Sequence, residues 1–282
     1  MRVVVVGAGL SGLVAARSLV SSGIDVTVVD KGRSPGGRLA TRRIGDATLD
    51  HGAQFFTVRT PAFRHRVDDW LERGLVHVWN HGFVDRDGHP RYAAAAGMNS
   101  LAKDLADGLD VQCSTMAFAI RPAASPAEPR WSVAIDDGTV RPADAVIVTT
   151  PLPQAFALLV DSGIELDETL VRTDYDRTIA LLAVLDRPAP VAPTGGVQNP
   201  NDDVSFVADN QAKGVSARPA VTLHASPAWS ERRWDDDLDT LRADLEQLAR
   251  PWLGGAVVEE AQVKKWRFAT PRTPWPEPCW TS

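Results

Sequence analysis

The sequence is poor in several features that mark particular classes of protein. Its two cysteines, Cys113 and Cys279, lie far apart and share no metal-ligand spacing, so an intracellular protein without disulfides is the simplest account. No stretch approaches the roughly 18 uninterrupted apolar residues of a membrane span, and we expect a cytoplasmic protein with no membrane partner. The net charge of −6 and the pI near 5.5 give no reason to expect nucleic acid as a partner.

Patterns typical of metal sites and of acid–base catalysis are also scarce. His77 and His81 are four residues apart, a spacing that aligns metal ligands on a helix, but they fall in a predicted strand and have no acidic partner in register. We therefore predict no metal site. No acid–base dyad stands out, so the catalytic residues are left unassigned.

Residues 2–30 carry the clearest signal in the chain. A β-branched run over residues 3–6 is typical of a strand buried on both faces, and it leads into Gly7, Gly9 and Gly12 at the GxGxxG spacing. At this spacing Gly7 allows a tight turn, Gly9 lets backbone N–H groups approach a pyrophosphate, and Gly12 permits close packing of a helix on the strand.

A helix and a second strand are predicted to follow. Apolar residues recur at helical spacing from Leu10, Gly23 lies where a left-handed cap would end the helix, and residues 26–29 return as a buried strand. Asp30 ends this strand and is placed to accept hydrogen bonds from an adenosine ribose. The order of strand, glycines, helix, strand and acid predicts a dinucleotide-binding domain, although the glycines alone do not separate NAD from FAD.

Further motifs follow this stretch, namely PGGR at 35–38, DHGAQFFT at 50–57, GMNSL at 97–101, ADAVIVTTP at 143–151 and KWRFATP at 265–271. Together with VGAGLSGL near the start, they make the chain resemble the FAD-dependent amine oxidase superfamily, and within it the renalase-like branch. A DxGAQ segment that ends in paired aromatics points to that branch, whereas VGAGLSGL and PGGR are shared by many flavoproteins.

The resemblance implies an α/β fold with two interleaved domains. One is a Rossmann-type FAD-binding domain with a parallel sheet, expected over 1–60 and 93–152. The other is an α+β substrate domain with an antiparallel sheet, expected over 61–92 and 153–268. The family ordinarily closes with a glycine- and acid-containing segment and a helix, whereas residues 269–282 are rich in proline. We therefore expect them to be the start of a truncated FAD-binding segment.

The resemblance also implies FAD as the cofactor and a set of residues that bind it. The expected cofactor-binding residues are Gly7, Gly9, Leu10, Ser11, Gly12, Asp30, Lys31, Gly37, Arg38, Gly52, Ala53, Gln54 and Phe55. Arg38 is expected near the pyrophosphate, which suits the forked donors of guanidinium, and Gln54 and Phe55 are expected beside the flavin. Small side chains at 52 and 53 would let the backbone come close to a planar ring.

The roles of the histidine and the paired aromatics in this segment are left undecided by the sequence. His51 could tune a flavin site, but a lone histidine is more often structural. One of Phe55 and Phe56 is expected to pack in the core. Of the tryptophans in the last quarter of the chain, we assign at most one or two to a pocket.

The remaining elements are predicted from periodicity and turn residues. Helices are expected over 61–74 and 235–252, a hairpin over 76–92 with its turn at Asp87-Gly88, and a meander over 117–140. The helix over 235–252 should carry Leu238, Leu241, Leu245 and Leu248 on one apolar face. Strands are expected over 109–113, 178–185, 204–207, 221–225 and 262–268, and a buried strand over 145–149. Residues 31–43 are basic and glycine-rich, which predicts a loop.

By resemblance, the function is that of an FAD-dependent oxidoreductase. It implies a small-molecule substrate, a misreduced NAD(P)H isomer whose hydride on ring position 2 or 6 passes to flavin N5, and dioxygen, which reoxidises the flavin and yields hydrogen peroxide. A flavin amine oxidase with an aromatic cage and a nucleotide-binding remnant without activity stay open as alternatives. An NAD-dependent dehydrogenase is disfavoured by PGGR and DHGAQFFT.

Overall fold

The computed structural model of the protein describes residues 1–83, 88–123, 129–277 and 279–282, which divide into two compact units. Unit 1 comprises Met1–Gly37, Leu101–Asp174 and Pro271–Ser282, and unit 2 comprises Arg38–Ser100 and Tyr175–Thr270. The domain boundaries predicted from the sequence fall after residues 60, 92, 152 and 268, whereas the compact units change over after 37, 100, 174 and 270. Which unit binds the cofactor and which the substrate stays a prediction.

Unit 1 is built on a parallel sheet with the strand order β11-β1-β2-β7. Its strands are β1 (Arg2–Val6), β2 (Asp25–Val29), β7 (Asp110–Gln112) and β11 (Ala145–Val148). Helix α1 (Leu10–Ser21) joins β1 to β2 and buries Leu13 and Ala16, and the following Gly23 has a φ of +76°. The strand, helix and strand predicted for this stretch are confirmed. Strand β11 is half-buried rather than buried as predicted, because it is an edge strand.

A small antiparallel sheet follows in the same unit, with the order β10-β9-β8. Its strands β8 (Ala117–Pro122), β9 (Trp131–Ile135) and β10 (Val140–Ala143) confirm the predicted meander, while residues 124–128 lie outside the described residues. Helix α3 (Asn99–Ala106) precedes this sheet in the sequence, and helices α4 (Leu152–Leu159) and α5 (Glu168–Val171) follow it after β11.

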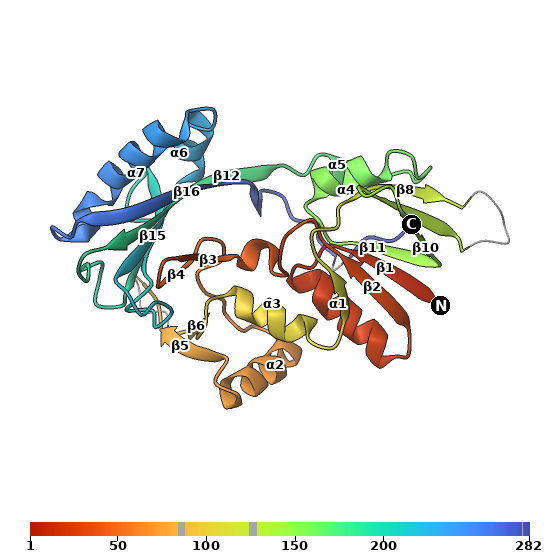
Figure 1. Cartoon of the computed structure of the whole chain (residues 1–282), viewed down its shortest axis with the longest axis horizontal. Coiled ribbons are helices and arrows are strands. Elements are labelled where there is room, and N and C mark those ends of the chain that lie inside the picture. Colours follow the sequence, from red (N-terminus) through yellow and green to blue (C-terminus); the bar gives the residue numbers. More distant parts are fainter. Residues whose placement is uncertain (84–87, 124–128, 278) are drawn as a thin grey trace. The chain divides into compact units, whose positions relative to one another are not determined.

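Unit 2 is built on a five-stranded sheet with the order β13-β14-β15-β12-β16, which extends the predicted antiparallel strands. Its strands are β12 (Tyr175–Leu185), β13 (Gly196–Gln198), β14 (Val204–Asp209), β15 (Ala220–Ala225) and β16 (Val258–Pro271). Figure 1 shows helix α7 (Leu238–Leu253) along this sheet, and the short α6 (Pro227–Arg232) precedes it. Leu241 and Leu245 of α7 are fully buried in this packing.

The start of α7 departs from the prediction. Asp237 caps the helix by accepting hydrogen bonds from the backbone N–H groups of Asp239 and Thr240. Leu238, which we expected on the apolar face, is 58% exposed because it occupies the first helical position next to this cap.

Two hairpins come from the N-terminal half of unit 2. The first joins β3 (Thr41–Ile44) to β4 (Ala47–Asp50), and its Ile44 and Leu49 pack with Leu182 of β12. The prediction of a loop over 31–43 is therefore wrong from residue 41, because pairing with β4 outweighs the basic composition. The second hairpin joins β5 (Val76–Asn80) to β6 (Arg91–Ala94) after helix α2 (Pro61–Glu72), as predicted, and Asp87 of its turn lies outside the described residues.

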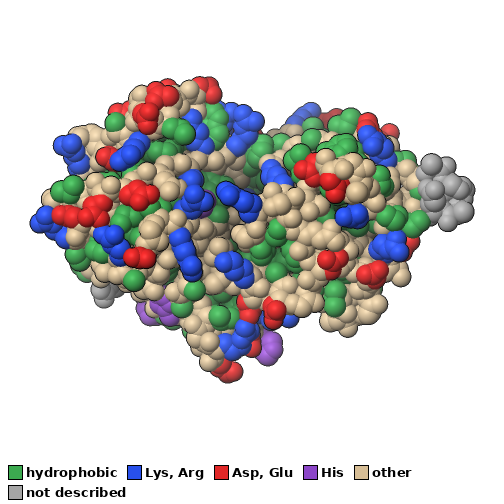
Figure 2. All heavy atoms as spheres, viewed as in Figure 1, with side chains coloured by type: hydrophobic (Ala, Val, Ile, Leu, Met, Phe, Trp, Pro, Cys, Tyr) green, Lys and Arg blue, Asp and Glu red, His purple; other side chains and the backbone are tan. Residues whose placement is uncertain are grey.

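Within the described residues no helix is both long enough and apolar enough to cross a membrane. Acidic and basic side chains both occur across the face drawn in Figure 2.

Candidate cofactor sites and cavity

The glycine turn of unit 1 has the geometry of an anion site. Gly7 has a φ of +112°, and a Cβ on Gly12 would lie 2.0 Å from the Gly7 carbonyl oxygen, so glycine is required at both positions. Gly9 differs, because no atom of the described chain lies within 4 Å of where its Cβ would be. Helix α1 begins at the exposed Leu10 and Ser11 with no side-chain cap and no acidic residue in its first turn. No side chain of the described residues caps this end of the helix and no acidic residue repels an anion there, so the positive end of the helix dipole suits a pyrophosphate.

Asp30 lies directly after β2 and is half-buried. Its Oδ2 accepts a hydrogen bond from Ala8 N at 2.6 Å, and its Oδ1 accepts one from Gly32 N at 2.6 Å. A carboxylate has about four lone-pair sites, so both oxygens keep acceptor capacity for hydroxyl groups. This fits the predicted contact with an adenosine ribose, which stays a prediction.

Gly36 and Gly37 of the PGGR motif lie beside the first glycine turn. Gly36 N donates to Ala8 O at 2.9 Å, and Gly36 and Gly9 form an isolated parallel bridge. A Cβ on Gly37 would lie 3.4 Å from Gly9 Cα, at a φ of +53°. Among the other predicted residues of this unit, Lys31 is exposed and its Nζ donates to Gln154 Oε1 at 3.2 Å. The structure thus brings the two predicted glycine motifs together.

Unit 2 contains a cavity of about 380 Å³. It is lined by Arg38, His51, Gly52, Ala53, Gln54, Phe55, Thr178, Gln198, Asn199, Ser205, Phe206, His224, Trp266, Ala269 and Thr270. Five of the predicted cofactor-binding residues are among them, and they come from the segments around η1 (Gly37–Leu39) and after β4. His51 also directly follows β4, and the rest come from the five-stranded sheet and the segments that flank its strands.

Gly52 of the DHGAQ segment has a structural reason besides the expected approach to a planar ring, which stays a prediction. A Cβ on Gly52 would lie 2.1 Å from the Arg38 carbonyl oxygen, and Ala53 N donates to that oxygen at 2.8 Å. Glycine is therefore needed for contact with the backbone of Arg38, whose Nη1 in turn donates to Ala269 O at 3.1 Å. Phe55 lines the cavity while Phe56 stacks on Tyr92, so one of the two aromatics packs away from the cavity.

The Gln54 carboxamide is buried, and both of its N–H donors are engaged within unit 2. Its Nε2 donates to Asp50 O at 2.8 Å and to Gly52 O at 3.1 Å, and its Oε1 accepts from Lys213 Nζ at 3.4 Å. The Lys213 ammonium can only donate, so its partner on Gln54 must be the amide oxygen. The backbone carbonyls can only accept, so their partner must be the NH₂ group, and the two assignments agree. Nε2 also lies 3.5 Å from His224 Nε2.

Both histidines of the cavity are neutral near pH 7. Burial lowers the pKa of His51 to about 4, and the nearby Lys264 acts in the same direction. Burial also lowers the pKa of His224 to about 4, although a hydrogen bond to the backbone of His51 opposes the shift. The His51 ring stacks on the indole of Trp266, with the ring centroids 5.3 Å apart.

A buried ion pair beneath the cavity was missed by the sequence reasoning. Lys213 Nζ lies 2.7 Å from Asp50 Oδ2, and both side chains are 0% exposed. Oδ1 of Asp50 accepts hydrogen bonds from Thr41 Oγ1 at 2.5 Å and from Met98 N at 2.7 Å. Asp50 belongs to the DHGAQ motif, but no motif marks Lys213. His224 carried no signal either, whereas Trp266 lies in KWRFATP and was one of the tryptophans considered.

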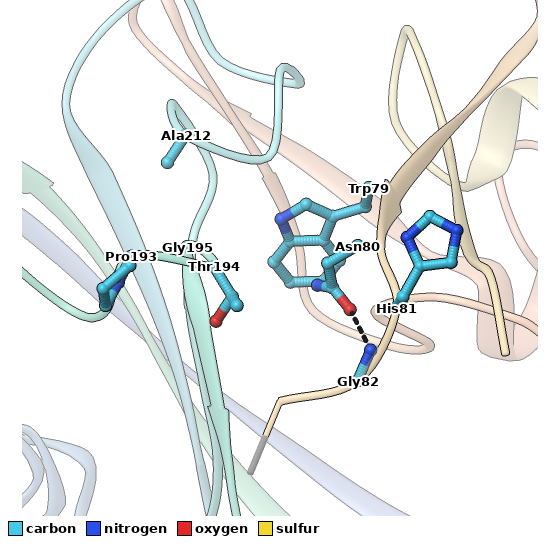
Figure 3. A pocket seen from close by; sticks show the side chains of 8 residues that line it. All are labelled: Trp79, Asn80, His81, Gly82, Pro193, Thr194, Gly195 and Ala212. Atoms are coloured by element: carbon cyan, nitrogen blue, oxygen red, sulfur yellow. Dashed lines mark hydrogen bonds between the residues drawn. The ribbon is translucent and has the colours of Figure 1, made fainter. Parts of the chain in front are cut away.

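A second cavity of about 360 Å³ lies elsewhere in unit 2 (Figure 3). It is lined by Trp79, Asn80, His81, Gly82, Pro193, Thr194, Gly195 and Ala212. Asn80 Oδ1 accepts a hydrogen bond from Gly82 N at 3.0 Å, while Asn80 Nδ2 and Trp79 Nε1 are buried without a partner in the described residues. His77, outside this lining, has its Nε2 2.8 Å from Lys213 O.

The Rossmann-type unit and the antiparallel unit together define the class of two-part flavin oxidoreductases. Residues 5–70 match the family of NAD(P)-binding Rossmann-like domains, and residues 72–279 match the flavin-containing amine oxidoreductase family. The chain belongs to the flavin-containing amine oxidoreductase family, and its cofactor is FAD.

Curated relatives carry several names. Renalase of Mus musculus is 29% identical over 175 residues, which cover 57% of this chain and 50% of renalase. A hydroxyneurosporene desaturase of Rubrivivax gelatinosus is 48% identical over 58 residues, which cover 21% of this chain and 11% of the desaturase. The chain therefore spans half or less of these relatives.

Solved structures share the fold. A putrescine oxidase bound to putrescine superposes with a TM-score of 0.66 at 16% identity, covering 90% of this chain and 82% of that one. A fatty acid isomerase from P. acnes that produces CLA superposes with a TM-score of 0.68 at 12% identity, covering 95% and 86%.

Proposed function

We propose that this protein is a renalase-like oxidoreductase that oxidises dihydronicotinamide dinucleotides carrying the hydride at position 2 or 6 of the ring. The observation that carries the proposal is the lining of the 380 Å³ cavity, in which none of the described residues has a carboxylate. A protonated amine buried in such a cavity would have no countercharge, and an unpaired buried charge is costly. A dihydronicotinamide ring is neutral and avoids that cost.

The polar groups of the cavity suit this ring. Gln198 and Asn199 supply amides, and Thr178, Ser205 and Thr270 supply hydroxyls, which match the donor and acceptor of a ring carboxamide. Phe55, Phe206 and Trp266 supply aromatic surface for a planar ring. The match to renalase supports the renalase-like branch to which this substrate class belongs by resemblance.

When bound, FAD would supply the hydride acceptor for the substrate and the means of reducing dioxygen, so that one hydride, one dioxygen and one proton give one hydrogen peroxide. The residues of the chain would bind the substrate, orient its ring against the flavin and exclude water. They need not exchange a proton with the substrate. This agrees with a cavity whose two histidines are neutral near pH 7, since the pKa of each is lowered to about 4.

The residues that bind FAD remain part of the proposal. In unit 1 they are Gly7, Gly9, Leu10, Ser11, Gly12, Asp30, Lys31 and Gly37, and in unit 2 they are Arg38, Gly52, Ala53, Gln54 and Phe55. The N-terminus of α1, which has no side-chain cap and no acidic residue in its first turn, supports the first group, as does the spare acceptor capacity of Asp30. The cavity lining supports the second.

Anaerobic mixing of the FAD-loaded protein with candidate substrates tests the proposal. We expect 2- or 6-dihydronicotinamide dinucleotides to bleach the flavin absorbance rapidly, and putrescine or a monoamine to leave it unchanged. On admission of dioxygen the colour should return with one hydrogen peroxide for each substrate oxidised. Rapid bleaching by an amine, with none by the dihydronicotinamides, would assign the protein to amine oxidation instead.

A further inference from the structure

His51 is fixed in the cavity wall through both its backbone and its ring. Its carbonyl oxygen accepts a hydrogen bond from Trp266 Nε1 at 2.7 Å, and its ring stacks on the same indole with 30° between the planes. The preceding residue, Asp50, is held by the buried ammonium of Lys213. The imidazole therefore has a defined place before any ligand binds.

The His51 side chain forms no hydrogen bond within the described residues, and its Nδ1 is buried. An unpaired buried polar atom costs about 1–3 kcal/mol, and such atoms in native structures call for an explanation, which is often a role in binding or catalysis. His224 differs, because its Nε2 lies 3.5 Å from Gln54 Nε2 and its ring bonds the His51 backbone. Because Nδ1 is buried, Nε2, which has no partner among the described residues and is not one of the buried unpaired atoms, is the ring nitrogen of His51 that a ligand in the cavity can reach.

The charges around His51 decide which ligand it suits. Burial lowers its pKa, Lys264 and Arg42 act in the same direction, and Asp50 acts against them. Arg38 adds a further cation to the cavity lining. A neutral imidazole among these groups offers one N–H donor and one nitrogen acceptor, and it gives a protonated amine no countercharge.

We propose that His51 is a specificity-determining residue, which through a ring nitrogen hydrogen-bonds the carboxamide of a nicotinamide ring in the cavity. The carboxamide has an acceptor oxygen and an NH₂ donor, so either neutral tautomer of His51 finds a partner. This proposal rests on the proposed function and goes beyond it by naming the residue that favours a neutral carboxamide over a cationic amine.

Binding is tested first without turnover. The FAD-loaded protein, labelled with ¹⁵N in its histidines, is titrated with 1,4,5,6-tetrahydronicotinamide mononucleotide, whose ring is neutral, keeps the carboxamide and transfers no hydride. The His51 resonances, assigned through His51→Gln, are expected to shift on binding, while those of the exposed His65 stay in place. The proposal is overturned if the mononucleotide does not bind, or if it perturbs the flavin absorbance and leaves the His51 resonances unchanged.

Two variants then separate the hydrogen bond from the shape of the ring. His51→Phe keeps an aromatic surface against Trp266 and removes both ring nitrogens, whereas His51→Gln keeps a donor and an acceptor. In anaerobic flavin reduction, we expect His51→Phe to raise the half-saturating dihydronicotinamide concentration about tenfold, the value of one net hydrogen bond, with the limiting rate unchanged. His51→Gln should stay within about threefold of the wild type. Equal losses in both variants would overturn the proposal.

His65→Gln, on the exposed face of α2, is the matched control and should match the wild type. Failure of the proposed function gives a different pattern from failure of the His51 proposal. If dihydronicotinamides do not reduce the wild-type flavin but His51 still responds to tetrahydronicotinamide mononucleotide, the reaction is wrong and the carboxamide contact stands. If reduction is normal and His51→Phe matches the wild type, the reaction stands and the His51 proposal is overturned.

Discussion

Asp30 of unit 1 and Asp50 of unit 2 each stand at the carboxyl end of a strand, yet their surroundings are opposite. The Asp30 carboxylate is half-buried and accepts hydrogen bonds from the backbone N–H groups of Ala8 and Gly32, with no cation partner among the described residues. The Asp50 carboxylate is 0% exposed and paired with Lys213, which is equally buried.

The difference separates a group that is available to a ligand from a group that holds the structure. Asp30 keeps acceptor capacity toward ribose hydroxyls, whereas Oδ1 of Asp50 is taken by Thr41 and Met98 and Oδ2 by Lys213. Replacing Asp30 should therefore act mainly on the cofactor. Replacing Asp50 should act mainly on folding.

The largest expected effect is at the buried pair. Asp50→Leu leaves the Lys213 ammonium buried and unpaired, and we expect the free energy of unfolding to fall by about 3–5 kcal/mol. The double variant Asp50→Leu/Lys213→Met removes both charges and should recover most of this loss. Urea unfolding of the two single variants and the double variant measures the coupling. A double variant no more stable than Asp50→Leu would contradict the account.

The next largest expected effect is the change in the free energy of unfolding with pH, caused by two histidines of unit 2. The pKa values of His51 and His224 are lowered to about 4 from an ordinary value of 6.5, so between about pH 6.5 and pH 4 the unfolded chain binds protons that the folded chain does not. Stability should therefore fall on acidification across this window, by about 2–3 kcal/mol for each histidine. Urea unfolding at pH 7 and pH 4.5 tests this. A His51→Gln/His224→Gln variant should show a flatter pH dependence.

Asp30→Ala should weaken FAD binding about ten- to hundredfold, because it removes the charged carboxylate that would accept hydrogen bonds from the ribose hydroxyls. Its effect on unfolding without FAD should be smaller than that of Asp50→Leu, because it leaves two neutral N–H groups, those of Ala8 and Gly32, unpaired and not a buried ammonium. Titration of the apoprotein with FAD, followed by flavin fluorescence, gives the affinity. Unchanged affinity in Asp30→Ala would remove the basis for the predicted ribose contact.

Gly9→Ala has the smallest expected effect on stability. Its Cβ would meet no described atom within 4 Å and its φ of −77° is open to alanine, so unfolding should change by less than about 0.5 kcal/mol. FAD affinity should nevertheless fall, because the methyl group would occupy the space through which a pyrophosphate approaches. Gly12→Ala is the contrasting variant, since its Cβ would lie 2.0 Å from Gly7 O and should impair folding itself.

The first turn of unit 1 was predictable because the residues that form it are neighbours in the sequence. Strand β1, the glycines and α1 follow one another in the chain, and each residue type has a conformational reason for its place. In unit 2 the DHGAQ segment was predicted to line a site, but the reason for Gly52, its contact with the Arg38 backbone, depends on chain packing that no local pattern reveals.

The parts that could not be predicted depend on distant contacts. Lys213 lies 163 residues from Asp50 in the chain, so neither residue alone indicates that it is paired. Residues 41–44 form a strand because β4 is there to pair with them, although their composition favours a loop. Leu238 fits an apolar face by spacing, but its position next to the Asp237 cap exposes it.

The central claim, hydride transfer from a neutral dihydronicotinamide, is tested most directly by the rate of flavin reduction with a substrate deuterated at the reduced ring carbon. The account predicts that under anaerobic conditions deuterium at position 2 or 6 slows flavin bleaching, while deuterium elsewhere on the ring does not. It would be contradicted by bleaching that is fast only with an amine and is slowed by deuterium on the carbon next to the amine nitrogen.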